Sequence, residues 1–140
     1  SKVNGGNDDW GSPNEASLVL KITYGSKSIL MQADTWGFIE LDILAGPYAG
    51  EVNACQVIKV GHHGLSAPGG VLPCHENYLD AAGVNKALIT DGDMAIHPTV
   101  VSRLQARNIR YWSSGSGDGY CWLRTDGSSS WEESESPTWP

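Results

Sequence analysis

Short runs of hydrophobic residues, separated by polar and glycine-rich stretches, predict the first elements of this chain. Residues 17–24 and 28–31 are apolar runs rich in β-branched side chains, and the glycine-serine pair between them is typical of a hairpin turn. Residues 35–45 carry apolar side chains at i, i+3 and i+7, which predicts an amphipathic helix that ends at a glycine-proline pair. The chain therefore opens with a hairpin followed by a helix.

The remainder continues the alternation of short buried strands and helices. The elements predicted there are strand 54–60, helix 74–82, strand 86–90, helix 97–108, strand 109–112 and a closing hairpin within 119–131. Strands that alternate with helices in the middle of a chain, with hairpins at both ends, indicate the α/β class with a mixed sheet.

Composition and charge narrow the classes of protein. A chain of 140 residues with 40% hydrophobic and 18% charged residues is typical of one globular domain. Its net charge of -7 makes extended nucleic-acid binding unlikely, since that needs clustered lysine and arginine. No apolar run approaches the roughly 20 residues of a membrane helix. Low lysine with abundant tryptophan, glycine and serine leans towards an extracellular protein, although the compartment stays open. Three cysteines without CxxC spacing indicate neither a disulfide framework nor a zinc ribbon.

Polar side chains follow several predicted strands. Asp34 ends the first hairpin, His62 and His63 stand between two glycines after strand 54–60, and Asp91 follows strand 86–90 together with Asp93. Strand ends of an α/β sheet gather at one edge, so these groups can build one site. Histidine nitrogens and aspartate oxygens are ligands for Zn²⁺ or Mn²⁺. Two structural alternatives stay open: Asp34 as a helix N-cap, and one histidine bonded to a backbone carbonyl.

The order of these features resembles one known family. The matching segments are residues 14–20 (NEASLVL), the strand that ends in Asp34, residues 57–64 (VIKVGHHG), residues 87–90 (ALIT), the His97-Pro98 pair, the helix ending at 104–108 (LQARN) and a closing hairpin. Together they resemble the C-terminal half of metallo-β-lactamase-fold hydrolases of the ComEC/Rec2 DNA-uptake and phosphorylcholine esterase type. The resemblance spans roughly residues 14–131, and VGHHG after a strand is its most specific part.

The resemblance implies a fold and a division of roles. The fold would be half of an αββα sandwich, formed by residues 14–131, with 1–13 as a linker or cut end and 132–140 as an acidic tail. Asp34 resembles the family's metal-bridging aspartate, although Ala33 replaces the usual glycine before it. His63 resembles a metal ligand and His62 the group that contacts the substrate phosphate. The implied substrate-binding set is His62, Ser66 and His97, and the alternative for His97 is a helix-start role, because a His-Pro pair suits a helix N-terminus.

The family's HxHxDH motif, which supplies most of the metal ligands, is absent from these 140 residues. The resemblance therefore implies an incomplete metal-dependent hydrolase, a phosphodiesterase or nuclease that uses metal-activated water, with Asp34 and His62 in catalytic roles and Zn or Mn as cofactor. A complementing N-terminal half, or a second copy in a homodimer, would have to complete it. The alternative is a non-catalytic remnant that acts as a binding or structural module.

A third hypothesis is a carbohydrate-binding or peptide-binding module that uses exposed tryptophans. Trp112, Trp122 and Trp131 fall on predicted strands at spacings that favour the core instead.

Overall fold

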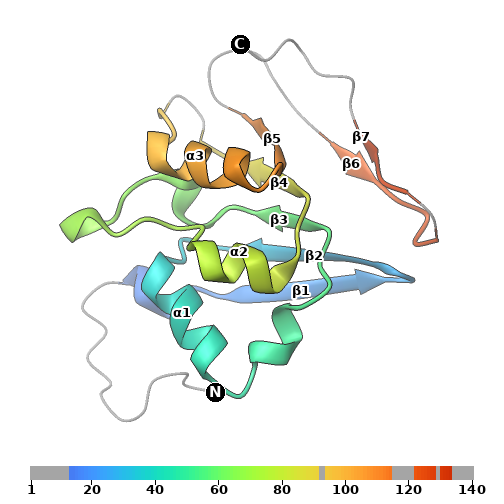
Figure 1. The fold of residues 1–140 in the computed structure, drawn as a ribbon, viewed down its shortest axis with the longest axis horizontal. Helices are drawn as coiled ribbons and strands as arrows, with labels where there is room; N and C mark the ends of the chain where they lie inside the picture. The colour runs from blue at the N-terminus through green and yellow to red at the C-terminus, as the bar shows by residue number, and fades with distance from the viewer. Residues whose placement is uncertain (1–12, 92–93, 115–121, 129, 134–140) are drawn as a thin grey trace.

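The protein is built on a five-stranded sheet whose strands follow one another in sequence order (Figure 1). The computed structural model describes residues 13–91, 94–114, 122–128 and 130–133. β1 is antiparallel to β2, and β2, β3, β4 and β5 are parallel. The strands are β1 (Val19–Tyr24), β2 (Lys27–Gln32), β3 (Val57–Lys59), β4 (Lys86–Ile89) and β5 (Arg110–Ser113).

In the described residues, three α-helices connect the parallel strands, and several shorter elements accompany them. The helices are α1 (Gly37–Ala45), α2 (Glu76–Ala82) and α3 (Pro98–Ala106). The 3-10 turns are η1 (Pro13–Ala16), η2 (Ala49–Val52), η3 (Gly61–Gly64) and η4 (Pro68–Gly70). A separate two-stranded ribbon is formed by β6 (Leu123–Arg124) and β7 (Glu132–Glu133).

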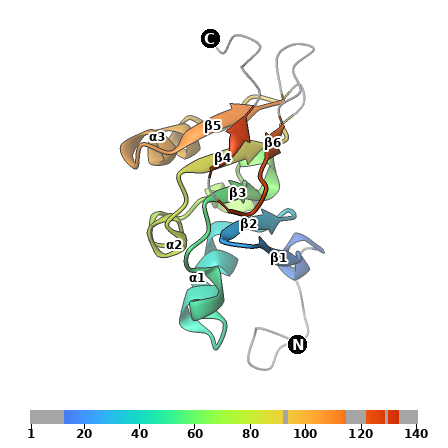
Figure 2. The ribbon, with the colours of Figure 1, turned by 90° about the vertical axis from the view of Figure 1, so that its right-hand side faces the viewer.

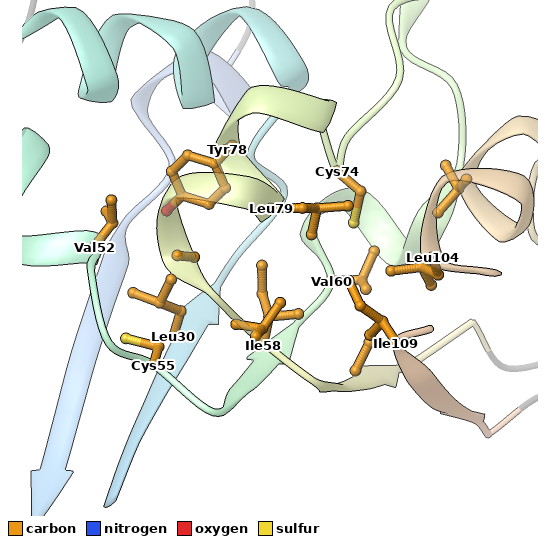
Figure 3. Close-up of a cluster of buried hydrophobic side chains, with 14 of the residues drawn as sticks. Leu30, Val52, Cys55, Ile58, Val60, Cys74, Tyr78, Leu79, Leu104 and Ile109 are labelled. Carbon is orange, nitrogen blue, oxygen red and sulfur yellow. The ribbon is translucent and has the colours of Figure 1, made fainter. Parts of the chain in front are cut away.

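The core lies between the sheet and the helices, which all cover the same face (Figures 1 and 2). Leu30, Ile58 and Ile89 project from successive parallel strands and are at most 1% exposed. They pack with Tyr78 and Leu79 of α2, among other helix residues (Figure 3). Burying one such large apolar side chain contributes about 1.5–3 kcal/mol, so this layer fixes the register of the strands.

The opposite face of the sheet is covered unevenly. Its β3–β5 part carries Val57 and Trp112, which are 0% and 1% exposed. The β6–β7 ribbon lies on this side of the sheet, away from the helices (Figure 2). Glu133 of β7 forms ion pairs with Lys86 and Arg110 on the same side. The ribbon thus ties the end of the described chain to β4 and β5.

The expected α/β class with a mixed sheet is confirmed, and the elements keep the predicted order. Glu132 and Glu133, expected in an acidic tail, instead form β7. Trp122, expected in the core, is 45% exposed. Residues 1–12 and 134–140, the outer parts of the expected linker and tail, lie outside the described residues. Within the described part of the chain, every helix is too short or too polar to cross a membrane.

Candidate functional site

Two of the predicted site residues meet at the ends of adjacent strands. Asp34 follows β2 and His63 follows β3, and because these strands are parallel both residues reach the same edge of the sheet. Asp34 Oδ1 lies 3.3 Å from His63 Nε2. The side chains are 38% and 35% exposed, so the pair can be reached from solvent. Asp34 does not cap α1, because the N-cap is Trp36 and no side chain bonds the helix end there.

The other ring nitrogen of His63 is held by the loop after β4. His63 Nδ1 contacts the carbonyl oxygen of Thr90 closely and lies 3.2 Å from the Thr90 hydroxyl oxygen. A carbonyl oxygen only accepts hydrogen bonds, so Nδ1 must carry the proton. In the neutral ring, Nε2 then presents its lone pair towards Asp34. Both hypotheses for the histidine doublet therefore apply to His63. It bonds to a backbone carbonyl through Nδ1, and its Nε2 lies beside the Asp34 carboxylate.

The histidine doublet has an unusual backbone. His62 and His63 have φ angles of 43° and 56°, and Gly64 follows with 74°. Two successive non-glycine residues in this left-handed region store strain, which persists only when the surroundings enforce it. Hydrogen bonds hold both ends of the turn: His62 N donates to Ala33 O at 3.1 Å, and His97 N donates to Gly64 O at 2.9 Å.

Gly61 allows the turn to approach β2 closely. A Cβ atom at this position would lie 2.3 Å from the carbonyl oxygen of Thr35. Gly61 N also donates to Gln32 Oε1 at 3.0 Å, a buried hydrogen bond. The glycine therefore brings the doublet within reach of Asp34, which is two residues beyond Gln32.

The buried carboxylate of Glu40 holds the segments around the histidine doublet through hydrogen bonds. Glu40 of α1 is 0% exposed and accepts a hydrogen bond from Gln32 Nε2 at 2.9 Å. It also accepts from the backbone N–H groups of Cys74 and His75 at 3.0 and 2.6 Å. Burial raises the pKa of Glu40, and these hydrogen bonds oppose the rise only in part.

Glu40 was not among the residues singled out from the sequence, although a signal was available. It lies four positions after Trp36 and three before Ile43, on the apolar stripe of α1. A charged residue on the buried stripe of a helix must find hydrogen-bond partners, which marks it as part of a network.

The remaining predicted site residues lie around the pair without joining it. His62 packs edge-on against Trp36, with ring centroids 5.9 Å apart, and its Nδ1 is buried. Ser66 is exposed in the loop that follows the doublet. His97 caps α3: its Nδ1 accepts from Thr99 N at 3.2 Å. The structure thus gives His97 a helix-start role.

Lys59 and Asp91 add charge to this edge of the sheet. Lys59 Nζ donates to Ala33 O at 3.4 Å. Burial lowers the pKa of Lys59, and the nearby Asp34 carboxylate partly restores it. Asp91 is 4% exposed and accepts a short hydrogen bond from the Ser113 hydroxyl. Asp93, the other acidic residue expected at this strand end, lies outside the described residues.

The Asp34–His63 pair fits part of a metal site. Zinc bonds to oxygen and nitrogen are about 2.0–2.2 Å long, so atoms 3.3 Å apart can bind one ion. The bond from Nδ1 to Thr90 is the support that metal-binding histidines commonly have. Among the described residues, no group of three or more His, Cys, Asp or Glu side chains is placed to hold an ion. Asp34 and His63 therefore need at least one further ligand.

Comparison with known proteins adds no relative: no protein-family model and no curated protein matches this chain.

Proposed function

We propose that this chain supplies Asp34 and His63 to a metal site of a phosphoester or phosphodiester hydrolase, which another polypeptide segment completes. The observation that carries the proposal is the Asp34–His63–Thr90 arrangement, in which one imidazole nitrogen is fixed by a carbonyl and the other faces a carboxylate. A strained left-handed backbone at His62 and His63 supports it, because such strain gathers at functional sites. Zn or Mn is the cofactor that suits these ligands.

The positions of Asp34, His63 and His62 assign each of them a different role in this proposed site. Asp34 and His63 would hold the cation, and the hydrogen bond to Thr90 would keep the His63 ring from turning away. A bound divalent ion supplies Lewis acidity and lowers the pKa of a water molecule. His62, with one nitrogen buried against Trp36, would donate from the other nitrogen to a phosphate oxygen as negative charge builds there.

A second candidate function is a non-catalytic binding or structural module. The same contacts favour it in one respect, because Asp34, His63 and Thr90 link the ends of three neighbouring strands through their own side chains and backbone. In that case His63 is the doubly protonated imidazolium, and its ion pair with the Asp34 carboxylate stabilises the sheet edge.

Calorimetric titration with Zn²⁺ and Mn²⁺ separates the two functions. The hydrolase proposal predicts weak binding to the wild-type chain, which supplies only two of the ligands, at least a tenfold loss for Asp34→Asn and for His63→Ala, and little change for His62→Ala. The matched His62 variant removes a neighbouring imidazole from the same turn, so it controls for general disruption. Absence of binding, or equal binding by all four proteins, contradicts the proposal. Loss of thermal stability in Asp34→Asn without any metal binding by the wild type would favour the structural module.

If metal binds, hydrolysis of bis(4-nitrophenyl) phosphate is the second test. The chain alone is expected to be nearly inactive, because its ligand set is incomplete. Addition of the segment that completes the site should raise the rate, and His62→Ala should lower kcat while leaving the metal affinity unchanged. A hydrolysis rate that is the same in the wild type, His62→Ala and His63→Ala would refute the roles assigned to these two residues.

A further inference from the structure

A second surface, separate from the Asp34–His63 edge, lies on the hairpin formed by β1 and β2. Leu20, Ile22 and Tyr24 alternate with Lys21, which pairs with the core residue Leu30, so they lie on the face away from the helices. Leu18 continues this alternation, and Met31 lies beside Leu20 in the strand register. The exposed fractions are 62% for Leu18, 46% for Leu20, 52% for Ile22, 64% for Tyr24 and 37% for Met31. We call these five side chains the hairpin patch.

The hairpin patch is about as large as the largest apolar patch of a typical monomer. At about 200 Å² for a large side chain, its exposed fractions correspond to roughly 500 Å². The largest apolar patch on a typical monomer covers about 300–600 Å² and is often functional. The β6–β7 ribbon lies on the same face of the sheet (Figure 2). Its turn reaches the β1–β2 turn, where Ser26 N donates to Gly127 O and Gly127 lies beside Tyr24. Leu18, Leu20, Ile22 and Tyr24 nevertheless remain at least 46% exposed.

The edge of the sheet beside the hairpin patch is open to pairing. β1 is the first strand of the sheet, and within the described residues it pairs on one side only, with β2. All six of its residues are regular strand without proline. A strand edge of this kind can accept an extended segment through backbone hydrogen bonds.

The positive charge on β1 indicates which kind of strand would pair with its edge. Residues 17–33 contain none of the 16 acidic residues of the chain, but they contain Lys21 and Lys27. Lys21 lies on the helix side of β1, where its Nζ donates to the uncharged carbonyl of Asn53 at 2.9 Å. A second copy would bring the same lysine to the edge, and lysine on an edge strand disfavours pairing of like copies. An acidic strand would instead place carboxylates beside Lys21.

We propose that the β1 edge binds an extended acidic segment of another polypeptide, in which apolar and acidic residues alternate. Its apolar side chains pack on the hairpin patch, and its carboxylates, on the other face of the extended sheet, lie beside Lys21. The chain already pairs a carboxylate with basic side chains of the sheet on the face away from the helices, where Glu133 of β7 forms ion pairs with Lys86 and Arg110. This inference does not depend on the proposed hydrolase function.

The test uses two synthetic peptides, four repeats of Glu-Val and four repeats of Lys-Val, titrated into the ¹⁵N-labelled chain in EDTA. EDTA removes any metal, so failure here and failure of the metal proposal are distinguishable. The Glu-Val peptide should shift the amide signals of β1 and slow their hydrogen exchange, whereas the Lys-Val peptide should bind at least tenfold more weakly. Lys21→Glu should reverse this preference.

Two further variants distinguish specific pairing at the β1 edge from non-specific hydrophobic binding of the peptide. Ile22→Thr keeps a β-branched residue but removes an apolar contact, so it should weaken binding of the Glu-Val peptide several-fold. Met94→Thr removes another apolar side chain that is 47% exposed, outside the hairpin patch, and should have no effect. Equal binding of both peptides, absence of binding, or dimerisation of the free chain through β1 would each overturn the proposal.

Discussion

Gly61→Ala is the substitution that most directly tests how the fold places the histidine doublet. The new Cβ would lie 2.3 Å from Thr35 O, so the turn must move away from the segment that follows β2 by most of an ångström. This movement strains the hydrogen bond from Gly61 N to Gln32 Oε1, which is 3.0 Å long and buried. Overpacking costs about 1–3 kcal/mol and an unsatisfied buried group about 1–3 kcal/mol, so we expect a loss of about 3 kcal/mol.

Urea denaturation followed by tryptophan fluorescence measures this loss. Gly50→Ala is the matched control: nothing lies within 4 Å of its added Cβ, and its φ is not positive. We expect Gly50→Ala to leave the free energy of unfolding unchanged or to raise it by about 0.4–1 kcal/mol through the entropy of the unfolded chain. A Gly61→Ala protein within about 0.5 kcal/mol of the wild type would refute the close approach of this turn to β2.

Three further predictions follow from the residues around the site. His97→Ala should lower the free energy of unfolding by about 1 kcal/mol, because the Thr99 N–H loses its cap, and His97→Asp should restore it; equal urea midpoints for all three proteins would contradict the cap. Gly64→Ala should cost at least about 1 kcal/mol more than Gly83→Ala in the same assay, because both glycines have positive φ but only Gly64 would place its Cβ 2.9 Å from a side chain. Glu40 has a raised pKa in the folded chain, so its contribution to stability is present below pH 4.5 and is lost as the pH rises through the folded-state value. In denaturation curves recorded over a pH series, Glu40→Gln should remove this loss of stability. The same pH dependence in the variant and the wild type would contradict the assignment to Glu40.

Local patterns in the sequence predict most of the fold. Gly25 and Ser26 do form the turn between β1 and β2, and β4 and β5 lie within one residue of the predicted strands. α2 ends at Gly83 in a left-handed C-cap, and Pro98 begins α3, as the sequence indicates. These features depend on residues that are close along the chain, where periodicity and capping preferences are informative.

Contacts between distant residues could not be predicted in the same way. The support of His63 by Thr90 depends on the pairing of β3 with β4, and its close contact is with a backbone carbonyl that no side-chain pattern reveals. The left-handed turn at His62 is likewise enforced by Ala33 and by neighbouring loops. The uneven cover of the sheet follows from where the β6–β7 ribbon lies, which tertiary packing decides.

The proposed metal site requires His63 to bind the ion through Nε2 while Nδ1 keeps its proton and donates it to the carbonyl oxygen of Thr90. The most direct measurement is ¹⁵N NMR of the histidine rings in the metal-free chain and after addition of Zn²⁺. We expect His63 to be the Nδ1-protonated tautomer before zinc is added, only its Nε2 signal to move on binding, and Asp34→Asn to reduce this response. A His63 protonated on Nε2, or a zinc response confined to other histidines, would contradict it.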